Sequence, residues 1–173
     1  DAVSILKFFK NQGRFSEIII AGHSEGSLIG MIAAKEGADA FISIAGAGEP
    51  IHNVVLSQIE KQVPGLKENA KTAFDEMLNN GSTSSYNAAL ETIFRPSVQP
   101  YMLSWMQFDP TTEIAKLDIP VLIIGGTKDL QVGVEQAEKL KAAKPDAQML
   151  IIDKMNHVMR IVEGDDIENA KTY

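Results

Sequence analysis

The sequence predicts an α/β fold, a parallel sheet with flanking helices. Short apolar runs rich in β-branched residues alternate along the chain with segments of helical periodicity. The runs lack polar alternation, which is typical of strands buried on both faces. Because parallel strands need crossover connections, the pattern predicts right-handed βαβ units and helices on both faces of the sheet. The length of 173 residues fits one domain.

The composition excludes several classes of protein. Hydrophobic residues make up 45% of the chain and charged residues 23%, which is typical of a globular domain rather than a disordered or collagenous one. The net charge of -7 argues against nucleic acid or an anionic membrane as a partner. Without Cys, the chain has no disulfides and no thiolate nucleophile, but its localisation stays open. No apolar run approaches the roughly 20 residues of a membrane span.

The first part of the chain predicts two helices and two strands. Apolar residues recur at helical spacing over 2–9, and Gly13 follows where a helix can take a left-handed end. The run at 18–20 is too short for a helix and too apolar for a half-exposed strand, so it predicts a buried strand. A helix over 28–34 and a second strand over 40–45 come next.

The last part of the chain repeats this alternation. Strands are predicted over 119–124 and 147–152, with a helix over 134–143 between them. The interval 49–116 has helical periodicity and several Pro and Gly breaks but no candidate strand. It is too long for a loop, so we expect a helical cap inserted into an α/β core formed by 1–48 and 117–173.

The most informative segment is the G-x-S-x-G motif at Gly22-His23-Ser24-Glu25-Gly26. A predicted buried strand runs directly into it and a helix follows directly, which is the context that this motif requires. A nucleophilic Ser on so tight a turn takes a strained backbone conformation, and glycines two residues before and after it avoid steric clash. We therefore expect the hydroxyl of Ser24 to lie above the sheet.

With this motif the sequence resembles the α/β-hydrolase family, and its serine esterases in particular. The family's chain order is nucleophile, acid, histidine. The resemblance implies an acid after a later strand, where IPVLIIGGTKD supplies Asp129, and a histidine after the next strand, where MLIIDKMNH supplies His157. The implied activity is that of a serine hydrolase on carboxylic esters, with Ser24 as nucleophile, His157 as general base and Asp129 orienting it. The backbone N–H of Glu25 is then the first oxyanion donor.

Each assignment has an alternative. Asp129 can instead cap the helical segment that follows it, and Asp153 also lies after a strand. His23 lies inside the motif and His52 precedes the acid, so the chain order favours His157. We expect His23 to pack beneath the turn, within reach of substrate. His52 is expected near the junction of the core and the cap, where it could meet substrate, although a surface role is favoured.

The predicted cap contains an apolar cluster that includes Met102, Trp105 and Met106. Such clusters usually belong to a core, but a cap helix of a hydrolase often lines the substrate pocket. These three residues and His23 are therefore the predicted substrate-binding residues. Three dispersed His and no Cys match no metal-ligand spacing, so the sequence predicts no metal and no cofactor.

The resemblance covers only the second half of the family's fold. The family has four earlier strands, and the loop after the third gives the second oxyanion donor. The strand at 17–21 is then expected at an apolar sheet edge, which predicts a homo-oligomer or a complementing N-terminal segment rather than a compact monomer. The alternative to an esterase is a truncated, non-catalytic remnant that acts as a binding or assembly module. The sequence does not distinguish esters from thioesters or amides.

Overall fold

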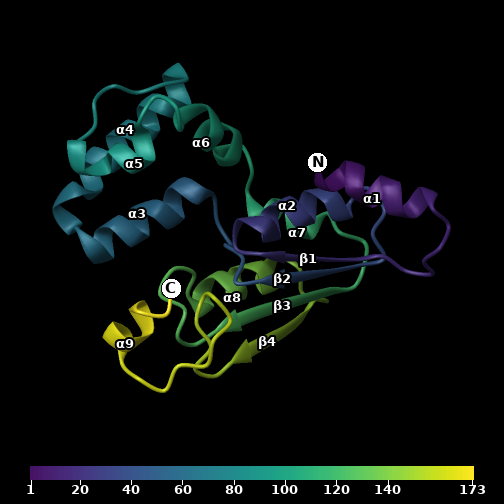
Figure 1. Cartoon of the computed structure of the whole chain (residues 1–173). Helices are drawn as coiled ribbons and strands as arrows, with labels where there is room; N and C mark the ends of the chain where they lie inside the picture. The colour runs from purple at the N-terminus through teal and green to yellow at the C-terminus, as the bar shows by residue number, and fades with distance from the viewer. The chain divides into compact units, whose positions relative to one another are not determined.

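The computed structural model describes residues 1–173 and divides the chain into two compact units (Figure 1). The first unit combines Asp1–Glu49 with Pro110–Tyr173, and the second is Pro50–Asp109.

Four strands form the sheet of the first unit, and every neighbouring pair is parallel. Their order across the sheet is their order in the chain. The register places Ile20 beside Phe41 and Ile42 beside Leu122. The strands are β1 (Ile19–His23), β2 (Ala40–Ile44), β3 (Val121–Gly126) and β4 (Gln148–Ile152). The predicted parallel α/β fold is confirmed.

Five helices belong to the same unit. They are α1 (Ala2–Asn11), α2 (Glu25–Ala34), α7 (Pro110–Ala115), α8 (Val134–Ala143) and α9 (Asp166–Ala170). The predicted helices correspond to α1, α2 and α8. The insertion expected from the sequence runs to residue 116, whereas the second unit ends at Asp109, because α7 packs against α2 and α8.

The crossover helices cover one face of the sheet, so the prediction that both faces are covered is wrong. The strand order never reverses, and right-handed crossovers between strands added in one direction all return over the same face. The core lies between this face and the helices. Its buried members are Leu6, Met31, Ala34, Ala38, Phe41, Ile114, Leu117, Val121, Ile123, Ala137, Leu140 and Ala147.

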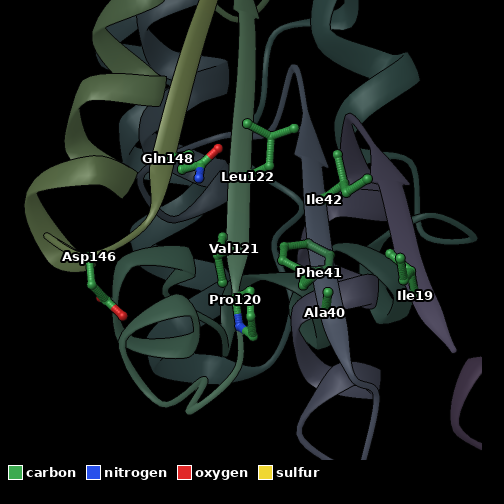
Figure 2. Close-up of a pocket in the computed structure, with 9 residues that line it drawn as sticks. All are labelled: Ile19, Ala40, Phe41, Ile42, Pro120, Val121, Leu122, Asp146 and Gln148. Carbon is green, nitrogen blue, oxygen red and sulfur yellow. The ribbon is translucent and has the colours of Figure 1, made fainter. Parts of the chain in front are cut away.

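The opposite face of the sheet carries apolar side chains without helical cover. Strand alternation places Ile19, Ile42, Leu122 and Leu150 on it. Ile19 is 55% exposed and Leu150 is 49% exposed. Figure 2 shows Ile19, Ile42 and Leu122 around an open hollow at the amino ends of the strands. β1 pairs only with β2, so it forms the sheet edge that the sequence predicts.

The second unit is entirely helical. Phe74, Met77 and Phe94 are buried in it, and the rings of Phe74 and Phe94 meet edge to face. The side-chain amide of Gln99 is buried and forms two hydrogen bonds with the backbone of Thr83. These bonds fix the segment that follows the longest helix of this unit. The elements are α3 (Ile51–Gln62), η1 (Pro64–Leu66), α4 (Lys67–Asn80), η2 (Ala88–Leu90), α5 (Glu91–Phe94) and α6 (Gln99–Met106). None of the helices in the chain combines the length and apolarity needed to cross a membrane.

A buried carboxylate fastens α7 to α2. Glu113 of α7 accepts hydrogen bonds from Lys35, at the end of α2, and from Lys116. Burial by itself raises the pKa of this carboxyl, but the bonds from Lys116 and Lys35 outweigh burial and hold the pKa below its usual value. A carboxyl of this kind adds stability above its unfolded pKa, and the contribution is lost as the pH falls through the lowered folded value.

We predict that Glu113→Gln lowers the free energy of unfolding by about 1 kcal/mol or more at neutral pH, because bonds to charged partners are weakened. Urea unfolding at a series of pH values checks this, and the gap between wild type and variant should close as the solution becomes more acidic than the unfolded pKa of the carboxyl. The matched control, Asp75→Asn, removes an exposed ion pair to Lys71 and should have a much smaller effect. A gap of constant size across the series would contradict the assignment.

Candidate active site

Ser24 lies in the turn between β1 and α2, at the carboxyl edge of the sheet. Its backbone has φ 55° and ψ -122°, the strained conformation that the motif predicts. The N–H of Ser24 donates to the carbonyl of Ile44 in β2 at 2.9 Å, and its carbonyl accepts from the N–H of Ser27 at 2.9 Å. These two bonds tie the turn to the neighbouring strand and to the first turn of α2.

The two glycines of the motif differ in their surroundings. A Cβ on Gly22 would lie 2.0 Å from the carbonyl oxygen of Gly26, so the turn has no room for a side chain there. A Cβ on Gly26 would have no heavy atom within 4 Å. The steric expectation is therefore correct for Gly22 and wrong for Gly26, because the turn brings the Gly26 carbonyl onto Gly22 while the Cα of Gly26 faces open space.

Two buried serine hydroxyls form a hydrogen bond close to the turn at Ser24. Ser27 Oγ and Ser43 Oγ are 2.7 Å apart, and both residues are fully buried. A Cβ on Gly46 would lie 2.3 Å from Ser27 Oγ, so the chain after β2 also closes on this pair. These serines were not among the residues predicted from the sequence. Their signal is a polar residue within an apolar pattern, which indicates a buried hydrogen bond.

Asp129 follows β3 and uses its two carboxylate oxygens differently. Oδ1 accepts the N–H groups of Gln131 and Val132, each at 2.8 Å. Oδ2 lies 2.8 Å from Nδ1 of His157. Oδ1 thus fixes the loop before α8, whose N-cap is Gly133, so the interpretation of Asp129 as a helix cap is wrong. The other oxygen faces the imidazole.

His157 lies after β4 and connects Asp129 to Ser24. Its Nε2 is 3.0 Å from Ser24 Oγ. His157 is 5% exposed and the Asp129 side chain is 1% exposed, so the bond between them is shielded from water. An imidazole protonated on Nδ1 donates to the carboxylate and leaves Nε2 to accept from the hydroxyl. The three residues selected by chain order therefore form one continuous hydrogen-bonded chain.

The loops that carry Asp129 and His157 are also bonded directly to each other. The N–H of Lys128 donates to the carbonyl of Met155 at 3.0 Å, and the N–H of Lys154 donates to Thr127 Oγ1 at 2.7 Å. A Cβ on Gly126 would lie 2.0 Å from the Met155 carbonyl oxygen. Glycine at the end of β3 is therefore what lets the two loops approach so closely.

The residues considered as alternatives to Asp129 and His157 make other contacts. Asp153 accepts a bond from Thr127 Oγ1 at 3.0 Å and does not contact His157. His52 lies on α3 in the second unit, where its ring contacts Phe74. His23 is half-buried, and its Nε2–H donates to the backbone carbonyl of His157 at 2.7 Å. His23 therefore supports the loop of His157, and a substrate contact by its side chain stays a prediction.

The other predicted substrate-binding residues all lie on α6 in the second unit. Met102 and Met106 are buried, and Trp105 is half-buried with its ring against Tyr101. Their role in substrate binding stays a prediction. Glu25 is the first residue of α2, so its N–H has no acceptor within the helix and is available to an oxyanion beside Ser24. No group of three or more Asp, Glu or His side chains is arranged to hold a metal ion.

Comparisons with known proteins agree with this architecture. No protein-family model matches the chain. In sequence the chain is similar to Esterase EstD of Thermotoga maritima, with 28% identity over 95% of this chain. The chain spans 40% of the length of that relative.

Solved structures that resemble most of this chain include two hydrolases. MGS-MChE2, an alpha/beta hydrolase enzyme from the metagenome of lagoon sediments, superposes with a TM-score of 0.55 over 98% of this chain and 66% of its own, at 19% sequence identity. An alpha/beta fold family hydrolase from Bacillus anthracis gives 0.57 over 96% and 70%, at 15% identity. At such identities these likenesses establish the fold alone.

The chain therefore has the α/β-hydrolase fold, and the resemblance predicted from the Ser24 motif is confirmed. Its sequence similarity to Esterase EstD agrees with the esterase-like character that the motif predicts.

We predict that Gly22→Ala and Gly26→Ala have opposite consequences for stability. The methyl group at Gly22 meets main-chain atoms that move only if the turn opens, at a cost of about 1–3 kcal/mol or more. At Gly26 the methyl group meets nothing, and Ala in place of a helical Gly stabilises by up to about 1 kcal/mol. Urea unfolding of the two variants side by side measures this, and equal destabilisation of both would contradict the steric account.

Proposed function

We propose that the protein is a serine hydrolase that acts on carboxylic esters by nucleophilic acyl transfer. The single observation that carries the proposal is the hydrogen-bonded chain from Ser24 Oγ through His157 to Asp129. A strained serine at a strand-to-helix turn, paired with an imidazole that a carboxylate orients, is the arrangement that activates a hydroxyl nucleophile.

In the proposed reaction, Ser24 Oγ attacks the ester carbonyl carbon while Nε2 of His157 takes the hydroxyl proton. Asp129 holds Nδ1–H and stabilises the imidazolium that forms. Collapse of the tetrahedral intermediate expels the alcohol, which receives the proton from His157. Water, activated by the same imidazole, then releases the carboxylic acid and restores Ser24.

We propose the backbone N–H of Glu25 as a donor to the developing negative charge. The N–H of Glu25 lies at the N-terminus of α2, where the helix dipole favours an anion. The preference for esters is supported by the similarity to Esterase EstD, since the nucleophile and base serve thioesters and amides equally well.

We predict that a fluorophosphonate probe labels the chain at Ser24 alone, because this hydroxyl bonds an imidazole that a carboxylate orients. Ser24→Ala should abolish labelling, and His157→Ala should slow it by about 10² to 10⁴ because general-base help is lost. Intact mass and peptide mapping measure the extent and the site of labelling over time.

Two matched variants serve as controls. Ser104→Ala removes an exposed hydroxyl of the second unit and should label like wild type. His23→Ala removes the imidazole that bonds the backbone of His157 and should slow labelling less than His157→Ala does, since its Nε2 faces a carbonyl and not the nucleophile. Labelling that survives Ser24→Ala, or that depends on His23 and not on His157, would refute the proposed roles.

We also propose that further polypeptide, a second copy or a complementing N-terminal segment, covers the open side of the sheet. The unpaired edge of β1 and the exposed apolar face with Ile19 and Leu150 are adjacent, and both are surfaces that proteins rarely leave to water.

We predict that the purified chain sediments as a dimer or larger species at micromolar concentration. Ile19→Lys and Leu150→Lys place charges on the open face and should shift the population toward monomer. Leu78→Lys, at a residue of α4 that is 51% exposed, is the matched control and should not change it. A wild-type chain that stays a folded monomer would exclude a second copy as the cover of the open face and leave the complementing segment.

A further inference from the structure

The last nine residues contact both loops of the candidate site. Asn169, on α9, is fully buried although its side chain is polar. Its Nδ2 donates to the backbone carbonyl of Lys128 at 2.6 Å, and its Oδ1 accepts from Nδ2 of Asn156 at 3.0 Å. Lys128 directly precedes Asp129 and Asn156 directly precedes His157. One amide therefore joins the positions just before the acid and just before the base.

The phenol of Tyr173 also bonds to both of these loops. The hydroxyl oxygen of Tyr173 accepts the N–H of Leu130 at 3.0 Å and the N–H of His157 at 3.4 Å. Its ring lies parallel to the His157 ring, with an interplanar angle of 6° and a centroid distance of 6.4 Å. Leu130 directly follows Asp129. The acid is thus held from the residue before it and from the residue after it.

Asn156 completes this network. It is fully buried, and its Nδ2 also donates to Thr172 Oγ1 at 2.6 Å. Its Oδ1 accepts the N–H groups of Val158 and Arg160, which fold the loop around His157. A buried amide that loses one of these partners is left with an unsatisfied group, so the network favours a single arrangement of the loops.

We infer that the segment 165–173 is a clamp that sets the geometry between Asp129 and His157, with Asn169 and Tyr173 as positioning residues. The inference rests on the proposed function, because the geometry that the clamp sets is that of the proposed base and its orienting acid. Neither residue contacts Ser24. Both act through the backbone on either side of Asp129 and through the loop of His157.

Such a clamp matters because the hydrogen bond between Asp129 and His157 forms only when the two side chains are close together. The Asp129 and His157 side chains extend from different loops, at the ends of β3 and β4, and meet at 2.8 Å. A displacement of about 1 Å between groups of this kind can reduce a rate about 10²-fold. Bonds from one amide and one phenol to both loops limit that displacement.

The test uses the full chain with p-nitrophenyl acetate as substrate. Tyr173→Phe removes the oxygen that accepts both N–H groups and keeps the ring beside His157. Asn169→Ala removes both amide bonds. Each variant should lower kcat by about 10- to 100-fold and leave KM within about twofold, since the acid and base are misplaced and the substrate contacts are not. Tyr86→Phe, which removes a phenol bonded to Glu91 in the second unit, is the control and should keep wild-type kcat.

A second readout does not depend on turnover. The Nδ1 proton of His157 in its bond to Asp129 gives a low-field proton resonance, identified by its loss in Asp129→Asn. In Tyr173→Phe and Asn169→Ala this proton should shift upfield and exchange faster with water, in samples whose unfolding curves show full folding. An unshifted, equally protected proton in both variants would overturn the inference, and so would a kcat loss no larger than the unfolded fraction.

The two readouts separate the inference from the proposed function. A wild-type chain that hydrolyses no ester but shows the low-field proton, with the expected sensitivity to both substitutions, contradicts the hydrolase and supports the clamp. If the chain is a hydrolase but neither its kcat nor its low-field proton changes in either variant, only the clamp is contradicted.

Discussion

The parallel alignment of the strands is the constraint on which the candidate site depends. Because β1, β3 and β4 run in one direction, the loops that follow them leave the sheet at the same edge. Ser24, Asp129 and His157 come from these three loops, and more than a hundred residues of sequence separate the first from the second. No local interaction brings them together. The parallel sheet brings the three loops to one edge. The side chains that extend from these loops are then close enough to complete the hydrogen bonds.

Two close backbone approaches convert this common edge into a defined geometry. Gly22 lets the turn at Ser24 fold back onto the carbonyl of Gly26, and Gly126 lets the end of β3 touch the carbonyl of Met155. Each glycine is required because a Cβ would lie 2.0 Å from a carbonyl oxygen. The buried amides of Asn156 and Asn169 then fix the loops around the imidazole. The glycines thus allow the close backbone approaches, and the buried hydrogen bonds hold the loops in place at the same edge of the sheet.

The sequence predicted the parts of this arrangement that depend on local patterns. Apolar runs identified the strands, and the chain order of Ser24, Asp129 and His157 identified the residues that the structure brings together. It could not predict that only one face of the sheet is covered, because that depends on the order of strands across the sheet. Nor did it predict the contacts of Asn169 and Tyr173, since hydrogen bonds between distant loops leave no periodic signal in a single sequence.

The proposed reaction requires Ser24 to attack an acyl carbon with help from His157. The most direct measurement is the mass of the intact chain after incubation with an aryl carbamate, whose carbamoyl adduct on a serine hydrolyses slowly. We expect one carbamoyl group per chain, located at Ser24 by peptide mapping, and none in His157→Ala on the same time scale. Carbamoylation at another residue, or equal carbamoylation of wild type and His157→Ala, would contradict it.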